Sequence, residues 1–152
     1  MKWVVLLGRV LLGGLFVIAA PGHFQAATIA MAAAHGVPLA KFAVPLAGVI
    51  AFAGGLSVIL GFKARLGGVL LALFLVPVTV MMHDFWAVAD AAAAQMQRGF
   101  FLGNLSHLGG ALLVCYFGAG PLSLDAWLSG RNAQGSHPGE ESKQSQSMGE
   151  AA

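Results

Sequence analysis

Residues 66–82 read LGGVLLALFLVPVTVMM, an apolar stretch without a charged side chain. A segment of this length and composition is close to what crosses the hydrocarbon core of a bilayer. Three further stretches, residues 3–20, 42–62 and 100–117, have a similar length and character. Lipid offers a backbone no hydrogen bonds, so each stretch must be a helix that satisfies its own N–H and C=O groups. The sequence therefore predicts an all-α membrane protein, an antiparallel bundle of four transmembrane helices.

The composition of the chain supports this prediction. Hydrophobic residues make up 58% of the 152 residues and charged residues 9%, whereas soluble domains carry roughly 25% charged residues. The formal net charge is +2, but the basic residues are scattered singly, which argues against nucleic-acid binding. We expect the lipid bilayer as the main partner, one transmembrane domain over residues 1–130, and a disordered polar tail over residues 131–152.

The first span could be mistaken for a secretory signal, because Lys2 precedes an apolar run that ends in small residues. Two features favour a retained helix instead. Arg9 interrupts the apolar run, and Pro21 follows the most natural cleavage site. We therefore expect the span to remain part of the protein.

Basic residues near the span ends indicate the orientation of the bundle. With four spans, the two termini lie on the same side of the membrane. That side carries Lys2, Lys63, Arg65, Arg131 and Lys143, and the opposite side carries Lys41 and Arg98. The excess of basic residues predicts that both termini are cytoplasmic.

The segments between the spans predict further local structure. Residues 62–66 are so few that the second and third spans must form a tight hairpin. The alanine-rich residues 25–34 predict a short helix that rests at the interface or folds over the mouth of the bundle. The alanine run 87–97 is expected to extend the third span until Gly99 ends it. After the fourth span, residues 123–129 predict an interfacial helix whose apolar side chains face the membrane.

Small residues at a spacing of four indicate where helices can pack closely. The pairs Ser57/Gly61, Gly99/Gly103 and Ser106/Gly110 have this spacing, and Gly54 and Gly55 precede the first of them. The predicted helix-packing set is Gly54, Gly55, Ser57, Gly61, Gly99, Gly103, Ser106 and Gly110. Such faces serve packing within one chain or a homo-oligomer, and the sequence leaves both open.

Arg9 lies about two turns inside the first span. Its guanidinium could extend to the headgroups. Alternatively it could pair with Asp125, the only acidic residue expected at that level, and so tie the first helix to the last. We favour the Arg9–Asp125 pair as a structural link.

A second polar group lies at the external end of the bundle. It consists of His83, Asp84, Trp86, Asn104 and His107. In the structural interpretation these residues anchor the helix ends at the membrane interface and bond across helices. In the functional interpretation they form an external pocket, where imidazole and amide groups hydrogen-bond a quinone carbonyl beside the flat indole ring.

Other cofactors have weaker support in the sequence. Haem ligation by His83 and His107 would need both rings at one depth, yet the spacing places His107 about 10 Å deeper by helix rise. Apart from the adjacent His83 and Asp84, no ligand pair has a recognised metal-binding spacing, so we expect no metal. Cys115 is the single cysteine, which excludes an intrachain disulfide and indicates a small apolar packing residue.

Taken in order, several short motifs over residues 8–125 resemble the DoxX family of small membrane proteins. The residues that carry the resemblance are GRVLLGGLF (8–16), Gly54 with Gly55, GFKAR (61–65), HDFW (83–86), Asn104, Gly109 with Gly110, and GAGPLSLD (118–125). The resemblance implies a four-helix protein of a bacterial or archaeal inner (plasma) membrane. It also implies a role as a subunit of thiosulfate:quinone oxidoreductase or of an oxidative-stress complex.

The chain departs from that family's pattern at two places. Many relatives carry a glutamate three residues before the paired glycines, where this chain has Ala51. The lysine often found after the first span is also not evident, since His23 and Phe24 occupy that neighbourhood. If those charged groups bind a substrate, this chain lacks that activity.

Two classes of function follow from the sequence. The first is a membrane subunit of a quinone-linked redox complex, at most part of an enzyme, because the chain has no cofactor motif of its own and a partner subunit would supply the electron carrier. The second is a non-enzymatic assembly, scaffold or stress-response component. A transporter is less favoured, because inverted repeats and broken helices are not evident.

Overall fold

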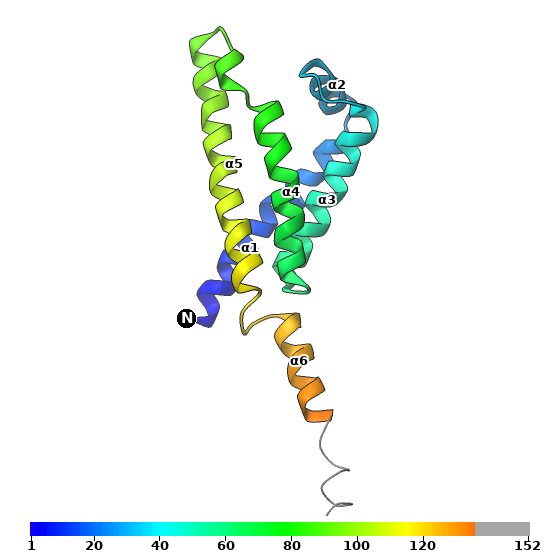
Figure 1. Ribbon diagram of the computed structural model, residues 1–152, viewed down its shortest axis with the longest axis vertical. Coiled ribbons are helices and arrows are strands. Elements are labelled where there is room, and N and C mark those ends of the chain that lie inside the picture. The colour runs from blue at the N-terminus through cyan, green and yellow to red at the C-terminus, as the bar shows by residue number, and fades with distance from the viewer. Residues whose placement is uncertain (136–152) are drawn as a thin grey trace, which may run out of the picture.

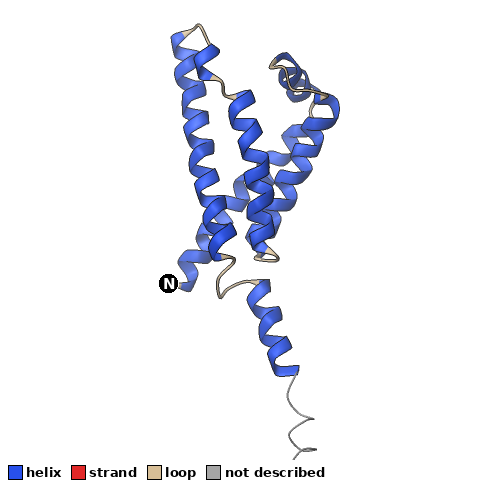
Figure 2. Ribbon diagram, in the orientation of Figure 1, coloured by secondary structure: helices blue, strands red, loops and turns tan. Residues whose placement is uncertain are grey.

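The computed structural model describes residues 1–135 of the chain (Figure 1). These residues form helices joined by short loops, without a strand (Figure 2). The elements are α1 (Lys2–Ala19), the 3₁₀ helix η1 (Ala20–Phe24), α2 (Ala26–Ala34), α3 (Ala40–Leu60), α4 (Ala64–Met82), the 3₁₀ helix η2 (Phe85–Ala87), α5 (Ala91–Phe117) and α6 (Leu124–Gly135).

The prediction of four transmembrane helices is confirmed. Within residues 1–135, the helices α1, α3, α4 and α5 are long and apolar enough to cross a membrane. The N-terminus and α6 lie at the same end of the bundle (Figure 1). We call it the terminal end, and it also carries the α3–α4 loop with Lys63 and Arg65. That this end is cytoplasmic stays a prediction.

The alanine run 87–97 does not extend the third span, so that prediction is wrong. The third span ends at Met82, and a new helix, α5, begins at Ala91 and runs for 27 residues. Its start is fixed by Asp90, whose carboxylate accepts a hydrogen bond from the Ala93 N–H at 2.8 Å. Gly99 does not end a helix, because it lies inside α5, where its backbone remains helical.

The C-terminal part also differs from expectation. The predicted interfacial helix over residues 123–129 corresponds to α6, which continues to Gly135. In Figure 1 α6 points away from the end of the bundle. Most of the predicted disordered tail, residues 136–152, lies outside the described residues.

The four spans pack in the order α1, α3, α4, α5, each against the next, while α1 and α5 make little contact with each other. The bundle is therefore open along one side. Its apolar core consists of Phe16, Ala51, Val58, Leu71, Phe74, Leu75 and Ala111. A smaller cluster, Ala32, Ala40 and Val44, joins the short helix α2 to the start of α3, at the end of the bundle opposite the terminal end.

Glycines allow α1 and α3 to cross at close range. A Cβ added to Gly13 would lie 2.5 Å from the Gly55 carbonyl oxygen, and a Cβ added to Gly55 would lie 2.7 Å from the Gly13 carbonyl oxygen. On the other side of α3, a Cβ at Gly54 would lie 3.1 Å from the Gly67 carbonyl oxygen of α4. α3 therefore packs closely against a neighbour on each side.

The predicted helix-packing residues make close contacts on α3 but mostly not on α5. Ser57 donates a hydrogen bond to the Phe62 carbonyl at 2.7 Å and lies against Gly67. Residues Gly99 and Gly103 of α5 face open space, since an added Cβ would meet nothing within 4 Å. Ser106 donates to Leu102 of its own helix at 3.1 Å, and Gly110 faces Leu12, with 3.3 Å from an added Cβ to the nearest side-chain atom.

Candidate functional site

Arg9 is buried at the terminal end of the bundle, with 3% of its surface exposed. Its Nη1 donates to the Ala119 carbonyl, and its Nη2 donates to the Leu122 carbonyl at 2.8 Å and more weakly to the Ile59 carbonyl at 3.3 Å. The guanidinium thus links α1, the end of α3 and the loop that follows α5. Gly61, with φ of +65°, leaves room for it, because a Cβ there would lie 2.7 Å from Nη1.

Asp125 lies in the same region but bonds to backbone groups. Its two carboxylate oxygens accept hydrogen bonds from the N–H groups of Lys63 at 2.8 Å and Ala64 at 3.1 Å. The Asp125 N–H in turn donates to the Gly61 carbonyl at 2.9 Å. Among the described residues, no direct ion pair joins Asp125 to Arg9. The two residues therefore fix the same junction by separate sets of bonds.

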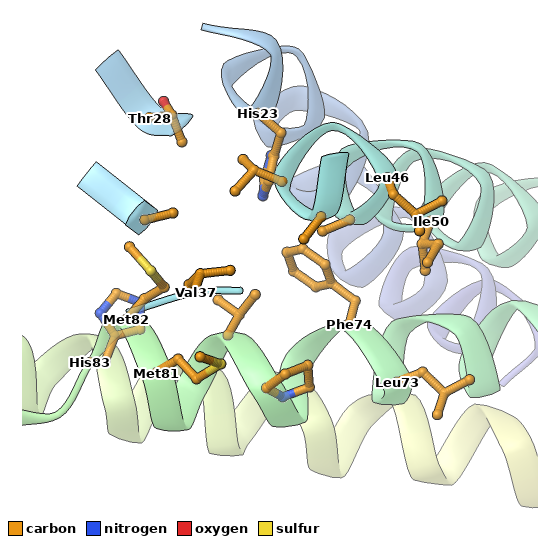
Figure 3. Close-up of a pocket in the computed structure, with 16 residues that line it drawn as sticks. His23, Thr28, Val37, Leu46, Ile50, Leu73, Phe74, Met81, Met82 and His83 are labelled. Carbon is orange, nitrogen blue, oxygen red and sulfur yellow. The ribbon is translucent and has the colours of Figure 1, made fainter. Parts of the chain in front are cut away.

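A cavity of about 400 Å³ opens toward the other end of the bundle, between α2, α3 and α4 (Figure 3). We call it the external cavity, a name that follows the predicted orientation of the bundle. Its walls are almost entirely apolar and come from Val37, Leu46, Ala47, Ile50, Leu73, Phe74, Pro77, Met81 and Met82. The polar residues that line it are His23, Thr28 and His83. Leu46 and Leu73 are 60% and 64% exposed, so the cavity opens to the lipid side of the bundle.

His23 is positioned by η1, the short extension of α1. It fits against α3 because of Gly48, where an added Cβ would lie 2.6 Å from the Cβ of His23. Its imidazole meets the Phe74 ring edge to face, with 5.4 Å between centroids. The Nδ1 atom of His23 is buried and has no hydrogen-bond partner among residues 1–135. A buried polar atom without a partner is costly. Because the imidazole of His23 also lines the external cavity, His23 is the candidate polar group for a bound molecule.

A series of edge-to-face ring contacts connects His23 to the interior of the bundle. Phe74 contacts Phe16 with 5.9 Å between centroids, and Phe16 contacts His107 with 6.1 Å. The Nδ1 atom of His107 is likewise buried and without a partner in the described part of the chain. The two histidines therefore lie at opposite ends of a phenylalanine pair, rather than in one pocket.

The five residues predicted to form an external pocket are found at separate places. His83 lines the external cavity, and its Nδ1 donates to Oε1 of Gln97 on α5 at 2.8 Å. Asp84 lies 3.8 Å from the Nδ1 of His35, at the C-cap of α2. Trp86 is 60% exposed and contacts Phe101 with 5.8 Å between ring centroids. Asn104 and His107 belong to α5 and do not line the cavity.

Three residues of the site, His23, Phe74 and Met81, are not among those predicted from the sequence. Phe74 and Met81 look like ordinary core and lipid-facing residues of a span, and nothing in the residue pattern separates them from these. His23 offered a weak signal, because it is a lone imidazole just after an apolar span, two residues beyond Pro21. The pairing of His23 with Gly48 is a tertiary contact that no local spacing predicts.

Metal and haem ligands are not gathered within residues 1–135, where no group of three or more histidine, cysteine or acidic side chains could hold a metal ion. His83 lies beside Phe100, with 5.5 Å between ring centroids, whereas His107 lies beside Phe16. Cys115 packs against Gly68, where an added Cβ would lie 2.8 Å from its sulfur. The site is thus an apolar cavity with a few polar groups.

Comparisons with known proteins place the chain among membrane proteins. The sequence model of the SURF4 family matches residues 5–128. The inner membrane protein YqjF of Escherichia coli (strain K12) is 32% identical over 127 residues, which cover 82% of this chain and 92% of that protein. No solved structure matches the chain.

These findings overturn the resemblance to the DoxX family, because neither comparison points to it. The motifs that carried the resemblance are mostly glycines, aromatic residues and charges at helix ends, which many small helical membrane proteins need for packing and anchoring. Ala51 illustrates the difference. It is 1% exposed and belongs to the apolar core, at the position where many DoxX relatives carry a glutamate.

Proposed function

The chain belongs to the SURF4 family, and we propose that this member binds one lipid-soluble molecule in the external cavity and has no catalytic activity of its own. Its four spans make it a multi-pass membrane protein. The inner-membrane relative supports a location in the inner membrane. The observation that carries the proposal is that the imidazoles of His23 and His83 line a largely apolar cavity that opens at the side of the bundle.

The size and chemistry of the cavity support this function. A volume of about 400 Å³ lies within the range of small-molecule sites, which are mostly apolar with a few polar groups that fix orientation. The exposed leucines at its mouth, Leu46 and Leu73, give a molecule dissolved in the bilayer a route into it. Flexible Met81 and Met82 can adjust to the shape of an occupant.

A quinone is the occupant that we propose within this class. The Phe74 ring and the aliphatic walls suit a flat ring, and the imidazole of His23 can donate a hydrogen bond to a ring carbonyl. The imidazole of His83 lies at the other wall of the cavity (Figure 3). A redox role would need a partner that delivers electrons to the bound quinone.

Filling the cavity tests this proposal. Ala47→Phe places a ring inside the cavity, whereas Ala53→Phe places the same ring on the exposed surface of α3. Mass spectrometry of gently extracted wild-type protein should detect a bound lipid-soluble molecule. Ala47→Phe should lower the amount of this molecule at least about tenfold, and Ala53→Phe should leave it unchanged. His23→Leu should weaken retention about tenfold, the value of one hydrogen bond. Wild-type protein that is always extracted empty contradicts the proposal.

A second candidate function is the recruitment of partner proteins through α5. Gly99 and Gly103 face open space at a spacing of four, which is the pattern of a close helix–helix contact with another chain. This candidate keeps the interpretation of the protein as an assembly or stress-response component, and it needs no bound molecule.

Bulky substitutions on α5 test the second candidate. Gly99→Leu combined with Gly103→Leu should abolish co-purification of a partner or a second copy, while the external cavity keeps its occupant. Gly109→Leu is the matched control, because Gly109 is equally open but lies about 120° around the helix from Gly103 at 3.6 residues per turn. Equal co-purification of all three forms would exclude this face as the contact.

A further inference from the structure

A second hollow lies at the terminal end of the bundle, remote from the external cavity. It has a volume of about 470 Å³ and forms between the start of α4 and the loop that leads from α5 to α6. The residues that matter here are Lys63, Arg65, Leu66, Phe117, Gly118 and Asp125. We call it the basic hollow.

The charge of the basic hollow is positive. Lys63 and Arg65 are both exposed there, and the buried Arg9 guanidinium lies behind the adjoining loop, where it bonds only to carbonyl groups. Asp125 is the one acidic residue that lines the hollow, and both of its oxygens already accept backbone N–H groups. The start of α4 adds the positive end of its helix dipole. The hollow therefore favours an anion.

Gly118 gives Arg65 its place in the hollow. An added Cβ at Gly118 would lie 3.4 Å from the Nε of Arg65, and the φ of +76° at this glycine disfavours any other residue. The arginine side chain thus packs across the end of α5, beside the mouth of the hollow. A guanidinium held in this way can offer two parallel N–H groups to a phosphate.

The floor of the basic hollow is apolar and faces the membrane. Leu66 and Phe117 line it and are 54% and 71% exposed. Both belong to the ends of spanning helices, so their exposed surfaces lie next to acyl chains. A ligand that satisfies the whole hollow must be amphipathic, with an anionic head beside the cations and a chain beside the apolar residues.

We propose that the basic hollow binds an anionic phospholipid of the surrounding bilayer. Its phosphate lies between Lys63 and Arg65, and one acyl chain runs along Leu66 and Phe117. The bound lipid joins the start of α4 to the end of α5 and supplies the negative charge that this end of the bundle lacks. The proposal is independent of the function proposed for the external cavity.

The test compares lipid binding by two double variants. Lys63→Gln with Arg65→Gln removes the cations of the hollow, and Lys41→Gln with Arg98→Gln removes two exposed cations from the opposite end. Each purified protein is reconstituted in nanodiscs of phosphatidylcholine with phosphatidylglycerol, and the lipids retained are counted by native mass spectrometry. Two cations near the headgroups should strengthen the binding of an anionic lipid about tenfold.

We expect wild-type protein to retain phosphatidylglycerol over phosphatidylcholine, the Lys63/Arg65 variant to lose that preference about tenfold, and the Lys41/Arg98 variant to keep it. Soluble glycerol phosphate at millimolar concentration should not displace the lipid, because it lacks the chain. The proposal is overturned if both double variants keep the preference or lose it equally. It is also overturned if glycerol phosphate competes as well as the lipid does, since the hollow would then be a plain phosphate site.

Discussion

Gly13→Val should lower the free energy of unfolding by about 3 kcal/mol, at the upper end of what overpacking costs. The first added carbon would lie 2.5 Å from the Gly55 carbonyl oxygen and 2.8 Å from a side-chain carbon of Ile59. Backbone atoms cannot move aside like the end of a flexible side chain, so α1 and α3 must separate along their crossing. Thermal and denaturant unfolding of the protein in detergent, followed by circular dichroism, measure the loss.

The neighbouring residue supplies the control for this prediction. Gly14 is also a glycine of α1, but an added Cβ there meets nothing within 4 Å. Gly14→Val therefore carries the same change in helix propensity without the collision. A destabilisation that is equal at the two positions would mean that α1 does not cross α3 at Gly13.

The spans of this protein could be predicted because hydropathy and length alone decide them. Residues 66–82 are too apolar for water and too long for most buried helices, so the prediction needed no tertiary contact. The ends of the helices were harder to predict than the spans themselves. The alanine run 87–97 suits any helix, and the cap that Asp90 provides starts a new helix, α5, at Ala91.

Helix partners were less predictable than helices. The spacing of small residues indicates that a close contact is possible, but it does not say which helix makes the contact. Gly55 meets Gly13 on α1, whereas Gly103 has the same kind of spacing and meets no other helix. This depends on the rotation and tilt of each helix, which are set by the whole bundle.

The candidate site was only partly predictable for the same reason. Polar residues near one end of the spans were expected to converge, yet His83 faces the cavity beside α2 while His107 faces Phe16 of α1. The decisive residue, His23, reaches the cavity because a 3₁₀ turn continues α1 and because Gly48 admits it. Both features depend on tertiary structure, and neither produces a periodic pattern in the sequence.

Arg9→Met should destabilise the protein by about 3 kcal/mol, because it removes a set of charge-assisted hydrogen bonds and leaves carbonyl groups without donors. The guanidinium now serves the carbonyls of Ala119 and Leu122, in the loop after α5, and more weakly that of Ile59, near the end of α3. Without it, the loop loses its link to α1. Unfolding in detergent and the rate of proteolysis of this loop should both report the change.

Arg9→Lys and Arg98→Met complete this experiment. A lysine keeps the charge but has a single nitrogen, which cannot reach carbonyls on separate segments as the planar guanidinium does. Arg9→Lys should therefore destabilise the protein by about half as much as Arg9→Met. Arg98 is an exposed cation of α5, and its replacement should change stability by less than about 0.5 kcal/mol. Full stability of Arg9→Lys would instead indicate that Arg9 acts only as a charge near the headgroups.

Joint charge reversal distinguishes the observed bonds from a direct ion pair. If Arg9 and Asp125 stabilised the fold mainly through each other, Arg9→Asp with Asp125→Arg would restore what each reversal loses. In the structure Arg9 donates to carbonyls and Asp125 accepts from the N–H groups of Lys63 and Ala64. A carboxylate at position 9 would face carbonyl oxygens, and a guanidinium at position 125 would face N–H groups, so the double variant should be at least as unstable as either single variant. Measured rescue of more than about 1 kcal/mol in a double-mutant cycle would establish the ion pair instead.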